Sequence, residues 1–498
     1  MKELDDRHIV AIDLGSSAIR LCVAHALQDE LQVDYYREAD SEGIRSSIIY
    51  NPQLVAGTVG AMVREAEEAF MGKVTQVVVG MPRKDVVELT ASMSVTRSAP
   101  DDYISREEIR NLKELALDSY PLPSPEKHEI YGAVAQAYEI DGGLTLTERN
   151  VVGTISPTLE GRFRVFVGRR QATVALDKVF NSLGIVVARR FFTPETTASA
   201  VLTDVEKSGG VALVDIGGGV TSVSVYQGGI LRHYASIPFG GKSVTGDIQT
   251  ECSLPEELAE SIKKKFGGCL PDKLGHLSEK VLDIRVADPP MELPVRYLSE
   301  IVGSRYREIV DAVLYLIQES GLMDSLRCGI VLTGGGSEQA HLVAMFKERS
   351  GYRVRTGKPR NLFTSAVGKD VFSTMSANVL GMVLAARDIP NLECLVTSEA
   401  PATVTPETTP TVDGEHAPEP LTEGEGLLFK PDEFGEPVTP PDGEKGGNKG
   451  KGKGKGKAPK KPSGFLSSLW TTIEDKALEW YDRFNEEGAE PGSQGKAV

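Results

Sequence analysis

The sequence predicts an α/β protein whose strands end in short polar or glycine-rich turns. Apolar strand-like runs, glycine turns and helix-like patterns alternate through residues 1–392 with few long polar gaps. Two strand–turn–strand segments, in residues 8–24 and 211–226, each place an aspartate at the end of the first strand. A third strand, in residues 329–337, runs into three consecutive glycines ahead of a helix-like stretch.

Composition indicates a globular protein with an acidic balance. The chain has 498 residues, 40% hydrophobic and 25% charged, with a formal net charge of −16, so it can form two or more domains. Nucleic acid is disfavoured as a partner, because phosphate contacts need clustered Lys and Arg. Five scattered cysteines without a C-x-x-C pair favour a reducing compartment over disulfides or a zinc site. Residues 1–8 are too polar for a signal peptide, and no apolar run reaches the about 18 residues of a membrane span.

The first strand–turn–strand segment reads HIVAIDLGSSAIRLCVA. Asp13 ends its first strand, and the turn carries Gly15, Ser16 and Ser17. Backbone N–H groups and hydroxyls in such a turn can bind a phosphate. Taken alone, the segment favours an ordinary hairpin that binds nothing.

The second segment, VALVDIGGGVTSVSVY, repeats this arrangement with Asp215 in the place of Asp13. Its turn and second strand supply Gly217, Gly218, Gly219 and Thr221. Glycine lets the backbone approach a ligand closely, and paired carboxylates suit Mg²⁺, often through water, beside phosphates. Because packing does not require the same aspartate in two hairpins, the repetition favours a shared phosphate and Mg²⁺ site.

The third turn, GIVLTGGGS, supplies Gly334, Gly335, Gly336 and Ser337. Glycines here let the chain pass close to a ribose or a base, and a following helix N-terminus favours negative charge. A nearby Gly241-Lys242-Ser243 looks like the end of a P-loop, but Ser236 occupies the position of the required first glycine. We therefore exclude a P-loop.

The three turns, in this order and spacing, resemble the actin/Hsp70/sugar-kinase ATPase superfamily. In that superfamily two hairpins bind the β- and γ-phosphates from two lobes, and a later glycine turn holds the adenosine. The resemblance implies a two-lobed actin-like fold that binds ATP and Mg²⁺.

Further stretches are similar to the FtsA family of bacterial cell-division proteins, over about residues 8–390 and again in the last helix. The most specific is GGILRHYASIPFGGKSVTGD at residues 228–247. Others are EGIRSSIIY at 42–50, VVVGMP at 77–82 and EELAESIKKKFG at 256–267.

The FtsA resemblance implies a division into subdomains. The first lobe would combine residues 1–83, 166–203 and 371–392, with an FtsA-type inserted subdomain at 84–165 that contacts other subunits and later division proteins. The second lobe would combine residues 204–233 and 325–370 with a subdomain at 234–324 that docks the C-terminal tail of FtsZ.

The resemblance also assigns three side chains outside the glycine turns. Glu260 and Lys263 match positions beside the adenine and ribose, although their spacing of three also fits a plain surface ion pair. The family segment E-P-L-A-S-A corresponds to Thr193–Ala200 here, and its acidic residue is displaced to Glu195. The resemblance implies that an acidic residue here orients the attacking water, so Glu195 is the catalytic candidate. A general base must reach its water, and a displacement of two residues works against that, so we expect hydrolysis to be slow at most.

The end of the chain reads as a linker followed by a membrane-binding helix. Residues 393–463 are first rich in Pro, Thr and Glu and then in Lys and Gly, which predicts a disordered tether. Residues 464–487 predict an amphipathic helix. Its apolar face carries Phe465, Leu466, Leu469, Trp470, Ile473, Trp480, Tyr481 and Phe484. The helix itself is acidic, but the eight lysines in residues 445–461 suit an anionic membrane surface; a partner-binding helix and a core helix are the alternatives.

These patterns and the resemblance together predict an ATP-binding cell-division protein. It would polymerise at the membrane, tether FtsZ filaments to the cytoplasmic face of the cell membrane at the division site and recruit late division proteins. A pilus-assembly adaptor and a small-molecule kinase of the same fold are the alternatives, and the C-terminal helix disfavours both.

Overall fold

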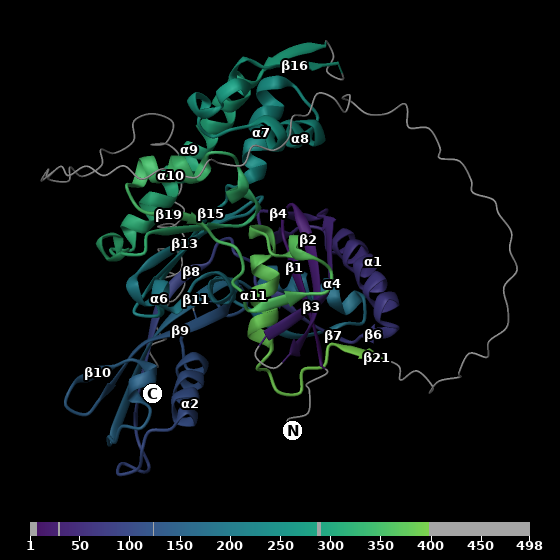
Figure 1. Ribbon diagram of the computed structural model, residues 1–498. Helices are drawn as coiled ribbons and strands as arrows, with labels where there is room; N and C mark the ends of the chain where they lie inside the picture. The colour runs from purple at the N-terminus through teal and green to yellow at the C-terminus, as the bar shows by residue number, and fades with distance from the viewer. Residues whose placement is uncertain (1–6, 28–29, 123, 286–289, 398–498) are drawn as a thin grey trace, which may run out of the picture. The chain divides into compact units, whose positions relative to one another are not determined.

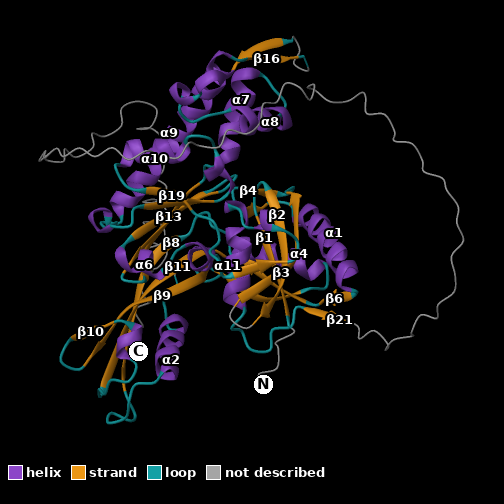
Figure 2. Ribbon diagram, viewed as in Figure 1, coloured by secondary structure: helices purple, strands orange, loops and turns teal. Residues whose placement is uncertain are grey.

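The computed structural model describes residues 7–27, 30–122, 124–285 and 290–397, which form three large sheets and the helices that pack on them (Figure 1, Figure 2). The predicted amphipathic helix at 464–487 and its apolar-face residues lie outside the described residues. So does the predicted linker, apart from residues 393–397.

The first sheet has six strands in the order β12-β7-β1-β2-β3-β20. They are β1 (His8–Leu14), β2 (Ala18–Leu27), β3 (Glu30–Asp40), β7 (Gln76–Gly80), β12 (Val186–Phe191) and β20 (Phe363–Ser365). Strands β1, β2 and β3 form an antiparallel meander, whereas β7 runs parallel to β1. The β1–β2 turn therefore lies at the end of two central strands, where its backbone can face a ligand.

Four helices pack near this sheet: α1 (Pro52–Phe70), α4 (Arg170–Ser182), α5 (Thr193–Val201) and α11 (Ala377–Ala386). Helix α1 begins at Asn51, whose side chain accepts the N–H groups of Gln53 and Leu54. Helix α11 is apolar on nearly all sides and packs between β1 and α5. Gly381 allows this packing, because a Cβ there would overlap the backbone of Thr196.

The second sheet has five strands in the order β15-β14-β13-β18-β19. They are β13 (Val211–Ile216), β14 (Thr221–Gln227), β15 (Ile230–Ile237), β18 (Ile330–Thr333) and β19 (Val354–Thr356). Helices α6 (Asp204–Gly209), α9 (Val295–Glu319) and α10 (Leu342–Ser350) contact its strands. An antiparallel β13–β14 hairpin beside the parallel strand β18 repeats the plan of β1, β2 and β7.

The third sheet lies largely within residues 84–165, where we predicted an insert. It is antiparallel in the order β10-β9-β11-β8, with strands β8 (Val87–Thr96), β9 (His128–Ile140), β10 (Leu144–Leu146) and β11 (Thr158–Arg169). Helix α2 (Arg106–Asp118) covers it, and α3 (Glu148–Val151) is one turn long. The sheet and α2 enclose their own apolar core around Leu112, Tyr138 and Phe163.

The remaining elements are short or belong to the helical part around α9. Helices α7 (Gly241–Cys252) and α8 (Glu256–Phe266) pack on α9 beside the hairpin of β16 (Val281–Ile284) and β17 (Met291–Pro294). Strands β4 (Ile44–Arg45) and β5 (Ile48–Ile49) pair with each other. The 3₁₀ turns are Pro271–Lys273, Gly275–Glu279, Met323–Ser325, Gly335–Glu338, Lys369–Val371 and Thr374–Ser376.

One boundary differs from the prediction. We placed the start of the disordered linker at residue 393, but β21 (Leu395–Thr397) pairs antiparallel with β6 (Gly72–Val74). Leu395 is buried, and Cys394 donates its backbone N–H to His8 O at 3.2 Å. A buried Leu and a ladder of backbone hydrogen bonds therefore extend the folded chain by one short strand. Within the described part, no helix is long and apolar enough to cross a bilayer.

Candidate functional site

The first turn is built by residues that follow Asp13, the penultimate residue of β1. Asp13 lies directly opposite Arg20 of β2 in the hairpin register. The Ser16 hydroxyl accepts the backbone N–H of Ser47 at 2.9 Å. Only glycine fits at position 15, because a Cβ there would lie 2.6 Å from Ala18 O. The Ser47 N–H therefore fixes the turn through Ser16, and Gly15 allows the turn to close tightly against Ala18 O.

The second turn follows Asp215, the penultimate residue of β13. The N–H of Gly217 donates to Val220 O at 2.9 Å and closes the turn. The carbonyl oxygen of Gly217 accepts the N–H of Gly241 at 2.9 Å, and that of Gly218 accepts the N–H of Lys242 at 2.8 Å. The first residues of α7 therefore fix this turn, and Gly241, set aside with the P-loop resemblance, belongs to the site.

The third turn follows β18, which pairs in parallel with β13. Gly334 has a φ of +82°, and a Cβ there would overlap Asp215 Oδ1. The Ser337 hydroxyl donates to Gly334 O at 2.6 Å and closes the turn from behind. Position 334 must therefore be glycine if the carboxylate of Asp215 is to lie where it does.

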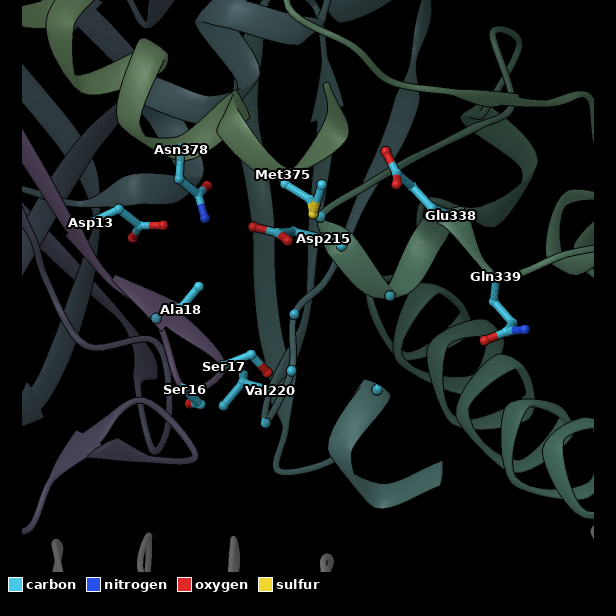
Figure 3. A pocket seen from close by; sticks show the side chains of 18 of the residues that line it. Asp13, Ser16, Ser17, Ala18, Asp215, Val220, Glu338, Gln339, Met375 and Asn378 are labelled. Atoms are coloured by element: carbon cyan, nitrogen blue, oxygen red, sulfur yellow. The ribbon is translucent and has the colours of Figure 1, made fainter. Parts of the chain in front are cut away.

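The three turns line one cavity of about 520 Å³ (Figure 3). Predicted residues that line it are Asp13, Gly15, Ser16, Ser17, Asp215, Gly217, Gly218, Gly219, Glu260, Lys263, Gly334, Gly335 and Gly336. Two of the predicted nucleotide-binding residues do not line it. Ser337 is buried behind the third turn, and Thr221 is buried and donates to Phe239 O at 2.9 Å. A cavity of this size is typical of small-molecule and cofactor sites.

Asp13 and Asp215 project into this cavity from different sheets, and they differ in their surroundings (Figure 3). Burial raises the pKa of the Asp13 carboxyl above its usual value, although the charges of Arg83 and Arg20 act against that rise. Asp215 forms an ion pair with Arg83, and both side chains are largely buried. Burial acts to lower the pKa of Arg83, but the carboxylates of Asp215 and Asp13 outweigh it and raise that pKa.

One oxygen of Asp215 has no partner. Its Oδ2 accepts from Arg83, whereas Oδ1 is buried without a hydrogen bond among the described residues. A buried carboxylate oxygen that lacks a donor is costly, and a cation or its bound water would satisfy it. The donor set, two carboxylates beside glycine turns, therefore fits Mg²⁺ beside a phosphate.

Glu260 and Lys263 do not form a plain surface pair. Lys263 is only 4% exposed. Its ammonium group donates to Gly241 O at 2.9 Å, to the Thr245 hydroxyl at 2.8 Å and to Glu260 Oε2 at 2.5 Å. Burial acts to raise the pKa of Glu260, but Lys263 and Thr245 outweigh it and hold that pKa below its usual value. The pair joins α8 to the start of α7, beside the second turn.

The structure does not bring Glu195 to this cavity. Glu195 lines a separate cavity of about 560 Å³ with Lys113, Lys207 and Tyr226, and burial raises the pKa of its carboxyl. The reason is helical geometry, because residues two apart point to different faces of α5. Thr193 is the residue that lies near Asp13, in the wall of a small adjoining cavity. The prediction of a general base at Glu195 therefore has no support in the geometry.

Several lining residues were missed by sequence reasoning. Arg83 directly follows the VVVGMP strand segment, and Asn378 lies in the apolar helix α11. Asn378 donates a hydrogen bond to Asp13 and accepts one from the Thr197 hydroxyl at 2.5 Å. A lone Asn in an otherwise apolar, buried helix was the available signal, since a buried amide needs partners.

Comparison with known proteins relates this chain to one group of proteins. The model of the family "Cell division protein FtsA" matches residues 212–380, which contain the second and third turns. The FtsA protein of Neisseria meningitidis serogroup B is 29% identical over 363 residues, covering 72% of this chain and 86% of its own. That of Pseudomonas aeruginosa is 29% identical over 370 residues, covering 74% and 87%.

The chain is similar to FtsA proteins over most of its length. Among solved structures, a PilM–PilN type IV pilus biogenesis complex contains a chain that superimposes with a TM-score of 0.54 at 14% identity, covering 76% of this chain and 99% of that one. At that identity the likeness concerns the fold alone. The similarity to FtsA proteins and the likeness of fold confirm the predicted actin-like α/β fold.

Proposed function

We propose that this protein acts as an FtsA protein, which binds ATP with Mg²⁺ in the 520 Å³ cavity and polymerises on the membrane. In that state it tethers FtsZ filaments to the cytoplasmic face of the cell membrane and recruits late division proteins. The observation that carries the proposal is the convergence of three glycine turns and two aspartates on one cavity.

The phosphates would lie between the first two turns. Ser16 and Ser17 supply hydroxyls and backbone N–H groups, whereas Gly217–Gly219 supply backbone alone. The two turns are close, because a Cβ on Gly218 would overlap the Ser17 side chain. Arg83 adds a positive charge at the same wall, and Arg is well suited to phosphate oxygens.

Mg²⁺ would be held by Asp13 and Asp215, directly or through water, and would neutralise phosphate charge when bound. Asp215 Oδ1 is the acceptor that lacks a partner in the protein. The adenosine would lie along Gly334–Gly336, with Glu260 and Lys263 in the same lining. Glu260 is the acceptor of that pair, and Lys263 keeps its carboxylate in place.

Hydrolysis would be slow at most, because no carboxylate is supplied by α5 at this cavity. Thr193 lies near Asp13 where Glu195 was predicted to act, and a hydroxyl is a much weaker base than a carboxylate. ATP would thus act mainly by favouring the conformation in which the protein polymerises.

Membrane binding would come from residues 464–487, tethered by residues 393–463. The tether would let the helix reach the surface, and the lysines upstream would contribute about 1 kcal/mol each near anionic lipid. Docking of the FtsZ tail would use residues 234–324, and contacts with other division proteins would use residues 84–165.

Liposome co-sedimentation with MgATP tests the tether. The full chain is compared with a chain that ends before Gly464, on vesicles with and without anionic lipid. We expect ATP-dependent pelleting of the full chain alone. Trp480→Glu on the apolar face should abolish it, whereas Ser468→Glu on the polar face should not. Equal pelleting of the full and truncated chains would exclude the helix as the anchor.

Nucleotide binding is measured separately, with a fluorescent ATP analogue and no lipid. Tight, Mg²⁺-dependent binding by both chains is expected, since the cavity lies wholly within residues 13–378. Failure to bind nucleotide would overturn the assignment of the cavity, independently of the membrane result.

A further inference from the structure

A second cluster of metal-binding side chains lies at the far end of the first sheet. His8 opens β1, His25 lies near the end of β2, and Asp34 lies in β3. Along β1, His8 is about 17 Å from Asp13 at the usual rise per strand residue. The cluster is therefore separate from the nucleotide cavity, whose lining does not include any of the three.

Strand pairing places the three side chains on one face. His8 lies directly opposite His25 in the β1–β2 register, and His25 lies opposite Gln32 in the β2–β3 register. Asp34 lies on the same side, because the Gln32 side-chain amide donates to its Oδ1 at 2.9 Å. The fold brings these residues together from three strands that are adjacent in the sheet.

Asp34 also occupies an irregular position in the ladder. The register shifts so that Val23 pairs with Tyr35 but Ala24 pairs with Val33, which leaves Asp34 without an opposite residue. Such bulges re-aim side chains and are often functional features. Here the bulge gives the Asp34 carboxylate room to reach toward both histidines.

The ligand atoms converge at distances that suit one ion. His25 Nδ1 lies 2.5 Å and His8 Nε2 lies 3.9 Å from the same oxygen, Asp34 Oδ2. All three ligand atoms lie within 4.8 Å of one another. Tetrahedral zinc with bonds of about 2.0–2.1 Å needs ligand atoms about 3.3 Å apart. The two distances to Asp34 Oδ2 lie on either side of that value, and each would change by less than 1 Å on metal binding.

The surrounding side chains orient these ligands. Gln32 donates its amide to Asp34 Oδ1 at 2.9 Å, which leaves Oδ2 directed at the histidines. The Phe70 ring packs edge-on against His8, with centroids 5.2 Å apart. Side-chain exposures of 23%, 20% and 13% for His8, His25 and Asp34 leave a path for an ion and a water. Hydrogen-bonded carboxylates and packed imidazoles are common features of metal sites.

We propose that His8, His25 and Asp34 form a binding site for a divalent transition-metal ion of the zinc class. Two imidazole nitrogens and one carboxylate oxygen favour Zn²⁺, Co²⁺ or Ni²⁺ over Mg²⁺, which prefers oxygen ligands. Three protein ligands leave a position for water, so the site resembles an open rather than a closed zinc site.

The bound ion would link β1, β2 and β3 at one end of these three adjacent strands. His8 O also accepts the N–H of Cys394, the residue before β21, which is the last described strand. Metal binding would thus stabilise the place where the start and the end of the folded chain meet. Because the ion binds the folded state, it should raise the unfolding temperature.

The test uses the full chain without nucleotide, since ATP chelates metals. Co²⁺ is titrated and followed by its visible d–d absorption, and Zn²⁺ is then added as a competitor. We expect one equivalent to bind, Zn²⁺ to displace Co²⁺, and Zn²⁺ to raise the midpoint of thermal unfolding. Asp34→Asn and His25→Gln should each weaken metal binding by at least about tenfold. Even the loss of a residue that only hydrogen-bonds to a metal ligand costs that much affinity.

His276→Ala provides the matched control, because His276 is an exposed histidine outside the cluster. It should bind the metal as the unchanged protein does. If the unchanged protein gives no Co²⁺ spectrum, or if Asp34→Asn and His25→Gln bind as tightly as the control, the cluster is only a His25–Asp34 ion pair. Circular dichroism of Asp34→Asn, a substitution that preserves shape, distinguishes a lost ligand from a lost fold.

Discussion

The β1–β2 and β13–β14 hairpins share a backbone plan but differ in how each holds its aspartate. Asp13 and Asp215 are both penultimate in their strands, and both strands pair with a parallel neighbour on the other side. Asp13 lies among Arg20, Arg83 and Asn378, and burial still raises its pKa. Asp215 has the direct ion pair with Arg83 and one oxygen without a partner.

The turns that follow the two aspartates differ in the same way. The first turn offers hydroxyls, and Ser16 is fixed by Ser47. The second turn offers only backbone, and the start of α7 fixes it through Gly217 O and Gly218 O. The difference indicates that one hairpin is suited to side-chain hydrogen bonds and the other to close backbone approach. The two halves of the site should therefore respond differently to equivalent substitutions.

The largest expected difference is between Asp215→Asn and Asp13→Asn in the nucleotide-free protein. Asp215→Asn leaves the buried Arg83 without its partner and should cost about 3 kcal/mol of unfolding free energy. Asp13→Asn removes a carboxylate whose charge burial disfavours, so stability should be unchanged or higher. Urea unfolding of both variants measures the contrast, and both should lose Mg²⁺-dependent nucleotide binding.

A double variant sharpens this test. Arg83→Met with Asp215→Asn removes both charges and should recover much of the lost stability. Equal destabilisation by Asp13→Asn and Asp215→Asn would show that the hairpins are energetically equivalent and would contradict the comparison.

The next largest effect is expected at the third turn, which supports only the second hairpin. Gly334→Ala places a Cβ at positive φ against Asp215 Oδ1, so it should cost more than about 1 kcal/mol and weaken nucleotide binding. Gly246→Ala in α7 is the control, because a Cβ there meets no atom within 4 Å. It should be neutral or slightly stabilising. Equal behaviour of the two variants in urea unfolding would remove the argument for a steric requirement at Gly334.

A smaller effect is expected at the first turn. Ser16→Ala removes the acceptor of the Ser47 N–H and should cost about 1 kcal/mol, with weaker binding of the nucleotide. Ser304→Ala is the matched control, because Ser304 is exposed and its hydroxyl donates to the carbonyl of Glu300 in its own helix. If Ser16→Ala leaves both stability and nucleotide affinity unchanged, the hydroxyl has no role in holding this turn.

These contrasts also show what the sequence could predict. The hairpins, the aspartates and the glycine turns are local patterns, and the site they form was predicted from their order. Arg83 and Asn378 were missed because their positions depend on how β7 and α11 pack against other segments, which no local pattern specifies. Strand β21 was missed because three residues carry too weak a pattern, and its pairing with β6 depends on distant residues.

Glu195 was assigned from a family resemblance, which does not specify where its side chain lies, and it gives the smallest expected effect on activity. Glu195→Gln should leave nucleotide affinity and ATP turnover unchanged, whereas Asp215→Asn should lose both.

Burial raises the pKa of Glu195 above the unfolded value of 4.5. The folded protein therefore binds the proton of the Glu195 carboxyl more tightly than the unfolded protein does. As the pH falls through the folded pKa, this carboxyl raises the free energy of unfolding. The variant should be the more stable protein near pH 8, and its advantage should shrink toward pH 4.5. Urea unfolding across that pH range measures the trend, and loss of ATP turnover in Glu195→Gln would restore the residue to the catalytic site.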